Sequence, residues 1–262
     1  MKITYIGHAT ILIQFGDVAL LTDPNFDSTL GRFLPRVSAP GIALDALPDI
    51  TAVLLTHAHA DHLSFRSLQA LPTTPVYAPP AVANWIQKKG VDAAQPLHPD
   101  STVEFEWGTV TAAPAVHAGQ RYGIDRWRKA SNMYLIDTNY GSVFFAGDTA
   151  LTAETTAMVE KRLHAEGRTL DVALLPIGYA PSWKVGFRKG HLTSADALTL
   201  FERLGARYLI PYHWGTFHHV TATAFDAITE LRAQVPQHHR GGDVHILEPG
   251  EAFDLALPTA RS

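Results

Sequence analysis

The sequence has no cysteine among its 262 residues, which removes disulfide bonds and thiolate metal ligands together. Any metal ion must therefore be held by nitrogen and oxygen atoms. The chain also lacks an apolar run long enough to cross a membrane, and its first residues lack the apolar core of a secretory signal. We therefore expect a cytoplasmic protein without a membrane span.

Charge is sparse as well. Charged residues are 18% of the chain, and 25 acidic against 21 basic residues give a formal net charge of −4. This balance excludes a protein built to coat nucleic acid, so no nucleic-acid partner is expected. A hydrophobic content of 46% excludes wholesale disorder. With no low-complexity linker in view, we predict a single domain over residues 1–262, as a monomer or a homo-oligomer.

Histidine, by contrast, is abundant, with 14 residues. A short apolar run at 53–55 leads into His57, His59, Asp61 and His62. In an extended segment His57 and His59 point to the same face, and the other two can approach from another side once the chain turns. Imidazoles and carboxylates bind borderline transition metals. Ordinary loop or core histidines are the alternative, but four ligand-type residues in six positions favour a metal site.

Apolar periodicity, glycine and proline predict a mixed α/β (α+β) chain with helices outside the sheets. Strands are expected at 2–6, 10–15, 18–22, 53–55, 76–78, 109–113, 133–136, 143–146, 172–175, 207–210 and near 244–247. Helices are expected at 63–71 with Ser64 as the N-cap, and at 80–89, 152–165, 193–204 and 222–234. Residues 24–48 and 118–131 are expected to be long loops.

Metal-type residues follow apolar strands four times along the chain. The cluster at 57–62 is joined by His117, Asp148 and His213, each at the end of a predicted strand. Strands that share a carboxyl edge would bring these seven groups together. Seven ligands are too many for one tetrahedral zinc ion but suit two divalent metal ions with a bridging carboxylate. Zinc is the expected metal, with manganese or iron as alternatives.

The residues His57-Ala58-His59-Ala60-Asp61-His62 form the His-x-His-x-Asp-His signature, and His117, Asp148 and His213 follow in the order of the same family. The sequence therefore resembles the metallo-β-lactamase superfamily. That resemblance implies a four-layer αββα sandwich. It also implies that His57, His59 and His117 hold one metal, that Asp61, His62 and His213 hold the other, and that Asp148 bridges them.

Further motifs narrow the resemblance. Residues 7–10, 21–24, 147–149, 176–181, 191–193 and 213–217 look like the branch that contains N-acyl-phosphatidylethanolamine-hydrolysing phospholipase D. The bacterial L-ascorbate-6-phosphate lactonases are more distant. By this resemblance His191 lies on the substrate side of the metals. The chain is shorter at its N-terminus than the animal phospholipases, which argues against a phospholipid substrate.

These residues together predict a binuclear metal-dependent hydrolase. A metal pair would convert water to hydroxide near neutral pH, for attack on a phosphodiester, another phosphate-bearing substrate or a lactone-type ester. Asp61 would orient the hydroxide, and His191 would donate a proton to the oxyanion or the leaving group. Asp23 and His8 would fix the orientation of the ligands, with ordinary turn chemistry as the alternative for both.

Basic residues in loops 118–131 and 178–192 suggest a small anionic substrate. The candidate substrate-binding residues are Arg121, Tyr122, Trp183, Arg188 and Trp214. A solvated charged surface and simple aromatic packing are the alternatives.

Two other functions stay open on sequence grounds. Some relatives are di-iron oxidoreductases, but they tend to replace a signature histidine with glutamate and to add a flavin domain, whereas this chain keeps His59. A non-catalytic regulatory member of the fold is the second alternative, and the complete set of ligand residues argues against it.

Overall fold

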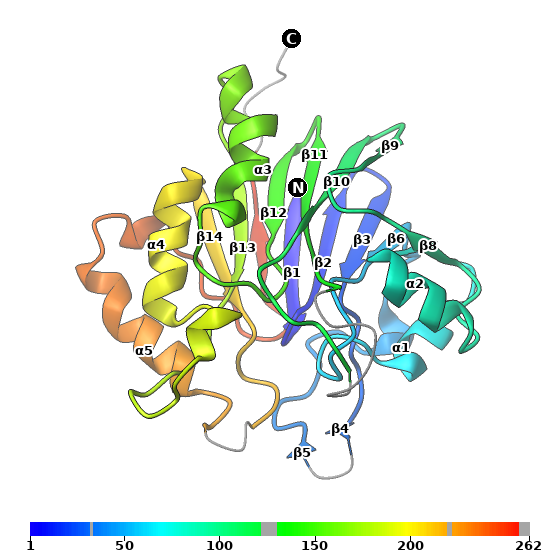
Figure 1. Cartoon of the computed structure of the whole chain (residues 1–262), viewed down its shortest axis with the longest axis horizontal. Coiled ribbons are helices and arrows are strands. Elements are labelled where there is room, and N and C mark those ends of the chain that lie inside the picture. Colours follow the sequence, from blue (N-terminus) through cyan, green and yellow to red (C-terminus); the bar gives the residue numbers. More distant parts are fainter. Residues whose placement is uncertain (32–33, 122–129, 219–221, 257–262) are drawn as a thin grey trace.

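The computed structural model describes residues 1–31, 34–121, 130–218 and 222–256, and it is built around two large β-sheets (Figure 1). The first sheet has the strand order β15 (Ala252–Asp254), β1 (Lys2–Gly7), β2 (Thr10–Phe15), β3 (Val18–Thr22), β6 (Ala52–Leu54), β7 (Val76–Ala78) and β8 (Ala94–Pro96). Its first part is an antiparallel meander, and β3, β6, β7 and β8 run parallel to one another.

The second sheet has the strand order β14 (Tyr208–Tyr212), β13 (Val172–Pro176), β12 (Gly141–Phe145), β11 (Asn132–Thr138), β10 (Gly108–Pro114) and β9 (Thr102–Phe105). Strands β12, β13 and β14 are parallel, and β9 to β12 are antiparallel neighbours. A small hairpin of β4 (Thr29–Leu30) and β5 (Leu34–Pro35) lies apart from both sheets.

In the described residues the sheets are flanked by the α-helices α1 (Phe65–Gln69), α2 (Pro80–Gln87), α3 (Glu154–Arg162), α4 (Ser194–Leu204) and α5 (Asp226–Gln234). Ser64 caps α1 as predicted, because its side chain accepts a hydrogen bond from the backbone N–H of Ser67. Helix α4 begins with a capping box between Thr193 and Asp196 and ends at Gly205, whose φ of 57° suits glycine. In Figure 1, α1 and α2 lie on one side of the sheets, and α3 and α4 lie on the other.

The side chains of a strand in the first sheet alternate between two apolar clusters, and this alternation explains why the layers stack. In β2, Ile11 and Ile13 belong to the core cluster shared with the second sheet, whereas Leu12 belongs to the cluster that includes residues of α1 and α2. Successive side chains of a strand point to opposite faces, so a sheet that is apolar on both faces is covered on both. Helices, two sheets and helices therefore form the αββα sandwich that the sequence predicts.

Strand direction determines where the polar groups gather. In the first sheet β1, β3 and β6 run the same way, and in the second β10, β12 and β14 do so. The residues that follow these six strands are therefore at the carboxyl ends of strands with a common direction, which is where open α/β sheets bind ligands.

The predicted strand near 244–247 is wrong. Val244 makes only an isolated bridge to Leu209, and the strand that completes the first sheet is β15, paired with β1. Strand β8, which pairs with β7, was not predicted. In the described part of loop 24–48 the chain forms β4, β5 and a 3₁₀ turn at Leu44–Ala46. Among the described residues no helix has the length and apolar character needed to span a membrane.

Tyr134 links the two sheets. It lies on β11, is fully buried, and donates its O–H to the carbonyl oxygen of Leu55 just beyond β6, at 2.7 Å. We expect Tyr134→Phe to lower the free energy of unfolding by about 1–3 kcal/mol, because a buried carbonyl loses its donor. Urea denaturation measures this. Tyr140→Phe, at a residue that is 37% exposed, is the matched control and should change stability by less than about 0.5 kcal/mol. Equal losses in both variants would contradict the link.

Candidate metal centre

Three residues at the carboxyl ends of strands adopt a backbone conformation that non-glycine residues disfavour. His8 follows β1 with φ of 55°, Asp23 follows β3 with φ of 33°, and His213 follows β14 with φ of 73°. A positive φ costs free energy at a residue with a Cβ, and such strain clusters at functional sites. A backbone hydrogen bond joins the residues that follow β14 and β1, because the N–H of His213 donates to the carbonyl oxygen of His8 at 2.9 Å.

The first metal-type cluster contains His57, His59, His117 and Asp148. Nδ1 of His59 lies 2.9 Å from Nε2 of His57 and 3.2 Å from Nε2 of His117. Oδ2 of Asp148 lies 3.9 Å from Nε2 of His57 and 3.8 Å from Nε2 of His117. Ligand atoms about 2.0–2.1 Å from a tetrahedral zinc are about 3.3 Å apart, which these separations bracket.

The hydrogen bonds on the outer side of these rings fix their tautomers. The hydroxyl of Thr56 donates to Oδ2 of Asp23 at 2.6 Å, so it accepts from Nδ1–H of His57 at 2.9 Å. Nδ1–H of His117 donates to the carbonyl oxygen of Gly190 at 2.7 Å. Burial lowers the pKa of His57 well below its ordinary value and that of His117 to about 4. Both rings are therefore neutral, and both turn a bare Nε2 lone pair towards His59.

Such a convergence of lone pairs fits a cation. A proton on Nδ1 of His59 can make one good hydrogen bond, to one of the two facing nitrogens, and leaves the other unmatched. A divalent ion bonded to all three nitrogens and to Asp148 satisfies the whole cluster. The donor set of nitrogen and oxygen atoms suits zinc, and it also accepts manganese or iron.

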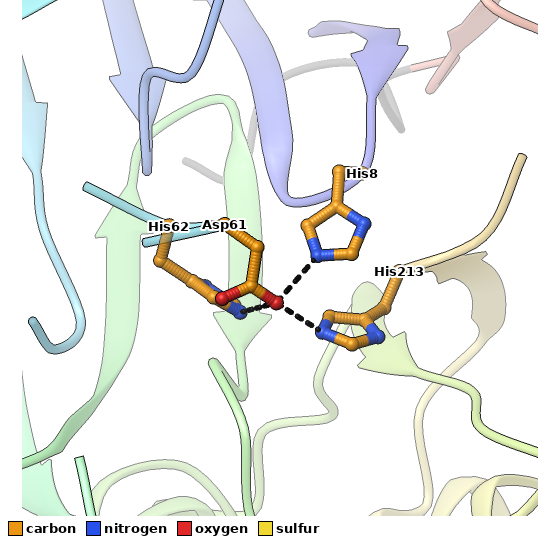
Figure 2. A group of neighbouring side chains, drawn as sticks. All are labelled: His8, Asp61, His62 and His213. Atoms are coloured by element: carbon orange, nitrogen blue, oxygen red, sulfur yellow. Dashed lines mark hydrogen bonds and ion pairs between the residues drawn. The ribbon is translucent and has the colours of Figure 1, made fainter. Parts of the chain in front are cut away.

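The second cluster contains His8, Asp61, His62 and His213, and Figure 2 shows the three rings around the carboxylate. Oδ2 of Asp61 lies 3.0 Å from Nε2 of His8, 3.5 Å from Nε2 of His213 and 3.8 Å from Nε2 of His62. His8 is close enough to donate a hydrogen bond to Asp61. Among the residues that the structure describes, the buried Nε2 atoms of His62 and His213 have no hydrogen-bond partner and lie 3.4–3.5 Å from carboxylate oxygens, an arrangement that suits metal ligands.

Asp148 lies between the two clusters. Its Oδ2 faces His57 and His117 and is 3.5 Å from Nε2 of His62, and its Oδ1 is 3.4 Å from Nε2 of His213. This position suits a carboxylate that bridges two metal ions.

Electrostatics at His62 also favour a cation. Burial alone would lower the pKa of this imidazole, but the carboxylates of Asp148 and Asp61 raise it well above its ordinary value. Burial opposes ionisation of Asp148 as well, yet His213 and His62 hold the pKa of its carboxyl well below the usual range. The site thus stabilises positive charge between buried carboxylates.

Asp23 makes hydrogen bonds at both ends of the signature. It is fully buried, and it accepts hydrogen bonds from the N–H and the O–H of Thr56 and, at 2.7 Å, from Nδ1–H of His62. Burial raises the pKa of Asp23, and the donors at His62 and Thr56 oppose that rise. Three donors around two oxygens fit the ionised carboxylate. This placement favours the orienting role over simple turn chemistry.

Sequence reasoning missed Thr56 and Asn25. Asn25 is 1% exposed, and its Nδ2 donates to the carbonyl oxygens of Ala60 and Asp61 at 2.8 and 3.2 Å, which holds the signature loop. Arg36 in turn donates to the carbonyl oxygen of Asn25. Thr56 could have been noticed, because its hydroxyl is adjacent to His57 in the sequence. No sequence pattern links Asn25 to Ala60, which is 35 residues away.

His191 lies at the edge of the first cluster. Its Nε2 is 3.7 Å from Oδ2 of Asp148, and its ring stacks on Phe187 with centroids 4.7 Å apart. It lines a small pocket of about 10 Å³ together with Asp148, Pro176, Ile177, Gly178, Phe187, Leu192 and His213. A space of this size holds about one water molecule, so His191 lies beside a water-sized space that also contacts Asp148 and His213.

The candidate substrate-binding residues are placed differently from expectation. Trp214 is 2% exposed and stacks on Tyr5 at 5.6 Å, so it packs in the core and is not a substrate wall. Arg121 donates hydrogen bonds to the carbonyl oxygens of Ala58 and Leu63 and so helps to hold the loop that carries the signature at residues 57–62. Arg188 pairs with Asp196 at 3.0 Å.

Two further candidates remain. Trp183 is 61% exposed, and Tyr122 lies outside the described residues. A third histidine group, Glu202, His238 and His239, lies away from the centre. There Nδ1 of His238 accepts the backbone N–H of Arg240, so its Nε2 carries the proton and donates to Glu202 at 2.8 Å. That tautomer fits a hydrogen bond and not a metal ligand.

Comparison with known proteins gives the family. A family model described as the beta-lactamase superfamily domain matches residues 19–214. A UPF0173 metal-dependent hydrolase from Alkaliphilus metalliredigens is 28% identical over 97% of this chain and 100% of its own length. An N-acyl-phosphatidylethanolamine-hydrolyzing phospholipase D 1 from Caenorhabditis elegans is 27% identical over 82% of this chain. This chain spans 64% of the length of that phospholipase.

Solved structures share the fold. An isothiocyanate hydrolase from Delia radicum gut bacteria superposes with a TM-score of 0.78 at 21% identity, covering 98% of this chain and 100% of its own. CmlA, a diiron beta-hydroxylase from Streptomyces venezuelae, superposes with a TM-score of 0.70 at 19% identity, covering 97% of this chain and 54% of its own. The matched family model and the αββα layers agree with the signature at residues 57–62: this chain belongs to the metallo-β-lactamase superfamily.

Proposed function

We propose that this chain is a binuclear metal-dependent hydrolase of ester bonds, with zinc as its metal. The observation that carries the proposal is the convergence of imidazole nitrogens on two points with the carboxylate of Asp148 between them. The name of the Alkaliphilus relative, a metal-dependent hydrolase matched over its whole length, supports the same activity. Both apolar core clusters include strands of the first sheet, which supports a single domain over residues 1–262.

In this proposal His57, His59 and His117 hold one metal, and Asp61, His62 and His213 hold the other. Asp148, whose carboxylate oxygens face both clusters, would be the ligand that they share. The chemistry that such a pair supplies when bound is a lowered pKa for a water molecule and polarisation of the scissile bond.

Two residues of the chain handle protons. Nδ1 of His191 lies 3.3 Å from the carbonyl oxygen of Phe187, which can only accept, so the proton is on Nδ1 and the Nε2 lone pair faces the pocket. Burial lowers the pKa of His191, which favours this neutral form. Nε2 of His191 thus takes a proton from the nucleophilic water and returns it to the leaving group. Asp61, held by the hydrogen bond from His8, orients the nucleophile.

The substrate is a small molecule with a carboxylic ester, lactone or phosphate ester bond. The phospholipase relative hydrolyses N-acyl-phosphatidylethanolamine, as its name says, and the structural neighbour from gut bacteria is named as an isothiocyanate hydrolase. Each of these reactions adds water at an electrophilic centre.

A di-iron oxidoreductase is the second candidate, because the diiron beta-hydroxylase shares the fold and the donor set here accepts iron. Metal analysis of the purified protein, coupled to a panel of phosphodiesters, phosphomonoesters and lactones, separates the two. Iron with oxygen consumption and no hydrolysis would favour the oxidoreductase.

Variants of the ligands and of His191 should separate metal binding from turnover. Asp148→Asn and His59→Ala are expected to lose metal and all hydrolysis, because each removes a ligand of the proposed pair. His191→Ala is expected to keep both metals and lose about 10²–10⁴-fold in rate. Mass spectrometry of bound metal and initial rates on the panel measure these effects.

The control for these variants is His239→Ala, at a side chain that is 71% exposed, and it should match the wild type in both measurements. Wild-type rates in His191→Ala on every substrate would rule out its role as a proton carrier.

Asp23→Asn tests the orienting network. The amide keeps the shape of the side chain but turns a donor towards either Thr56 or His62, where a donor already lies. We expect metal affinity to fall about 10–100-fold, mainly at the ion held by His62. Competition with a chromophoric chelator measures both binding steps. Asp17→Asn, in the exposed turn between β2 and β3, is the matched control, and unchanged affinity in Asp23→Asn would refute the network.

A further inference from the structure

The loop between β13 and α4 contains two backbone acceptors that hold histidines of the site. The carbonyl oxygen of Gly190 accepts a hydrogen bond from Nδ1–H of His117 at 2.7 Å. The carbonyl oxygen of Phe187 accepts one from Nδ1–H of His191 at 3.3 Å. The 3₁₀ turn at Phe187–Lys189 joins the two acceptors, because the N–H of Gly190 also donates to the carbonyl oxygen of Phe187, at 3.3 Å. A displacement of Phe187 therefore reaches a candidate metal ligand and the proposed proton carrier together.

The Phe187 ring is wedged among three neighbours. The ring of His191 stacks on it, with centroids 4.7 Å apart and planes at 18°. Nζ of Lys184 lies 4.2 Å from the centroid of the Phe187 ring and donates to the carbonyl oxygen of Tyr179 at 3.1 Å. Gly178 lies against the tip of the ring, where a Cβ would be 2.4 Å from Cζ and 2.9 Å from Cε1. The ring thus fills the space that a side chain at position 178 would need.

The outer side of this loop contributes little to its shape. Trp183 is 61% exposed and Val185 is 92% exposed, so neither side chain anchors the loop by burial. The Phe187 ring, by contrast, is partly buried and lies against His191. We expect the loop to keep its position through this ring and not through its exposed tip.

We infer that Phe187 is a positioning residue, which sets the places of His117 and His191 through the turn at its own carbonyl. Position 178 is a glycine because the ring needs that room. Phe187 acts through the two histidines and not on the reacting atoms. The inference rests on the proposed hydrolase activity where it concerns His191, and only on the candidate metal centre where it concerns His117. Small displacements matter, because a shift of about 1 Å can cost about 100-fold in rate.

Gly178→Ala tests the inference by pushing the ring aside. On the substrate of the panel that the wild type hydrolyses fastest, kcat should fall about 10–100-fold, and KM should change by less than about twofold. Affinity for zinc should fall about tenfold in competition with a chromophoric chelator, because the acceptor of His117 moves. His191→Ala is expected to lose rate and keep its metal, so a joint loss identifies the loop and not His191 alone.

Two variants serve as matched controls. Val185→Ala lies in the same loop at an exposed residue, and Gly242→Ala adds a Cβ that meets no atom within 4 Å. Both should keep the wild-type kcat and the wild-type affinity for zinc. Losses that these controls share with Gly178→Ala would overturn the inference.

A double variant shows whether the ring carries the effect. Phe187→Ala should cause losses like those of Gly178→Ala, and it also frees the space that the added methyl group needs. In the Phe187→Ala background, Gly178→Ala should therefore change rate and affinity by less than about twofold. Losses that multiply in the double variant would mean that the two residues act independently, which would overturn the inference.

Nuclear magnetic resonance gives a measurement that needs no turnover. In the zinc-loaded wild type, Nδ1–H of His117 should exchange slowly with water, because it is bonded to the carbonyl oxygen of Gly190. Phe187→Ala should lose this slowly exchanging signal, and Val185→Ala should keep it. A slow signal in Phe187→Ala would overturn the role of Phe187 at His117.

Failure of the hydrolase proposal would look different. A zinc-loaded wild type that hydrolyses nothing on the panel would overturn the proposed activity, and with it the role of Phe187 at His191. The zinc affinities and the exchange of the His117 proton would still support or overturn its role at the metal centre.

Discussion

The hydrogen bond from a histidine Nδ1–H to a fixed acceptor is the interaction on which the centre depends. Thr56 accepts it from His57, the carbonyl oxygen of Gly190 from His117, and Asp23 from His62. In each ring the proton is held on the outer nitrogen, so the inner nitrogen has its lone pair free. Asp23 serves two of these rings, directly at His62 and through Thr56 at His57. The positive φ at Asp23 is what brings its carboxylate to both.

How far the sequence predicts this site depends on which part is considered. The clustering of the candidate ligands was predictable, because a strand followed by imidazoles and a carboxylate carries its chemistry in residue types and spacing. The groups that support these residues were harder to find, because their hydrogen bonds involve backbone oxygens. Gly190 contributes a backbone carbonyl 73 residues from His117, and Asn25 holds the signature loop through main-chain oxygens. Backbone acceptors leave no pattern in residue identity.

The same reasoning explains the errors. Trp214 follows a predicted ligand, so its indole could either line a substrate site or pack in the core. Only its burial, at 2% exposed, distinguishes the two. Arg121 and Arg188 suggested an anion site, and each has a partner in this chain: Arg121 donates to main-chain carbonyl oxygens, and Arg188, whose side chain is 66% exposed, pairs with Asp196. The segment at 244–247 has strand-like residues, but β1 pairs with residues 252–254 instead, and pairing between distant segments is what local propensity does not encode.

His191 links the candidate metal centre to the loop that contains Phe187 and Gly190. Its neighbour Gly190 accepts the hydrogen bond from His117, its ring stacks on Phe187, and its Nε2 lies 3.7 Å from Oδ2 of Asp148. A Cβ on Gly178 would lie 2.4 Å from Cζ of Phe187, so a side chain at position 178 would displace the Phe187 ring. One short loop thus positions both a candidate ligand and the proposed proton carrier, and a change that moves this loop would alter the two together.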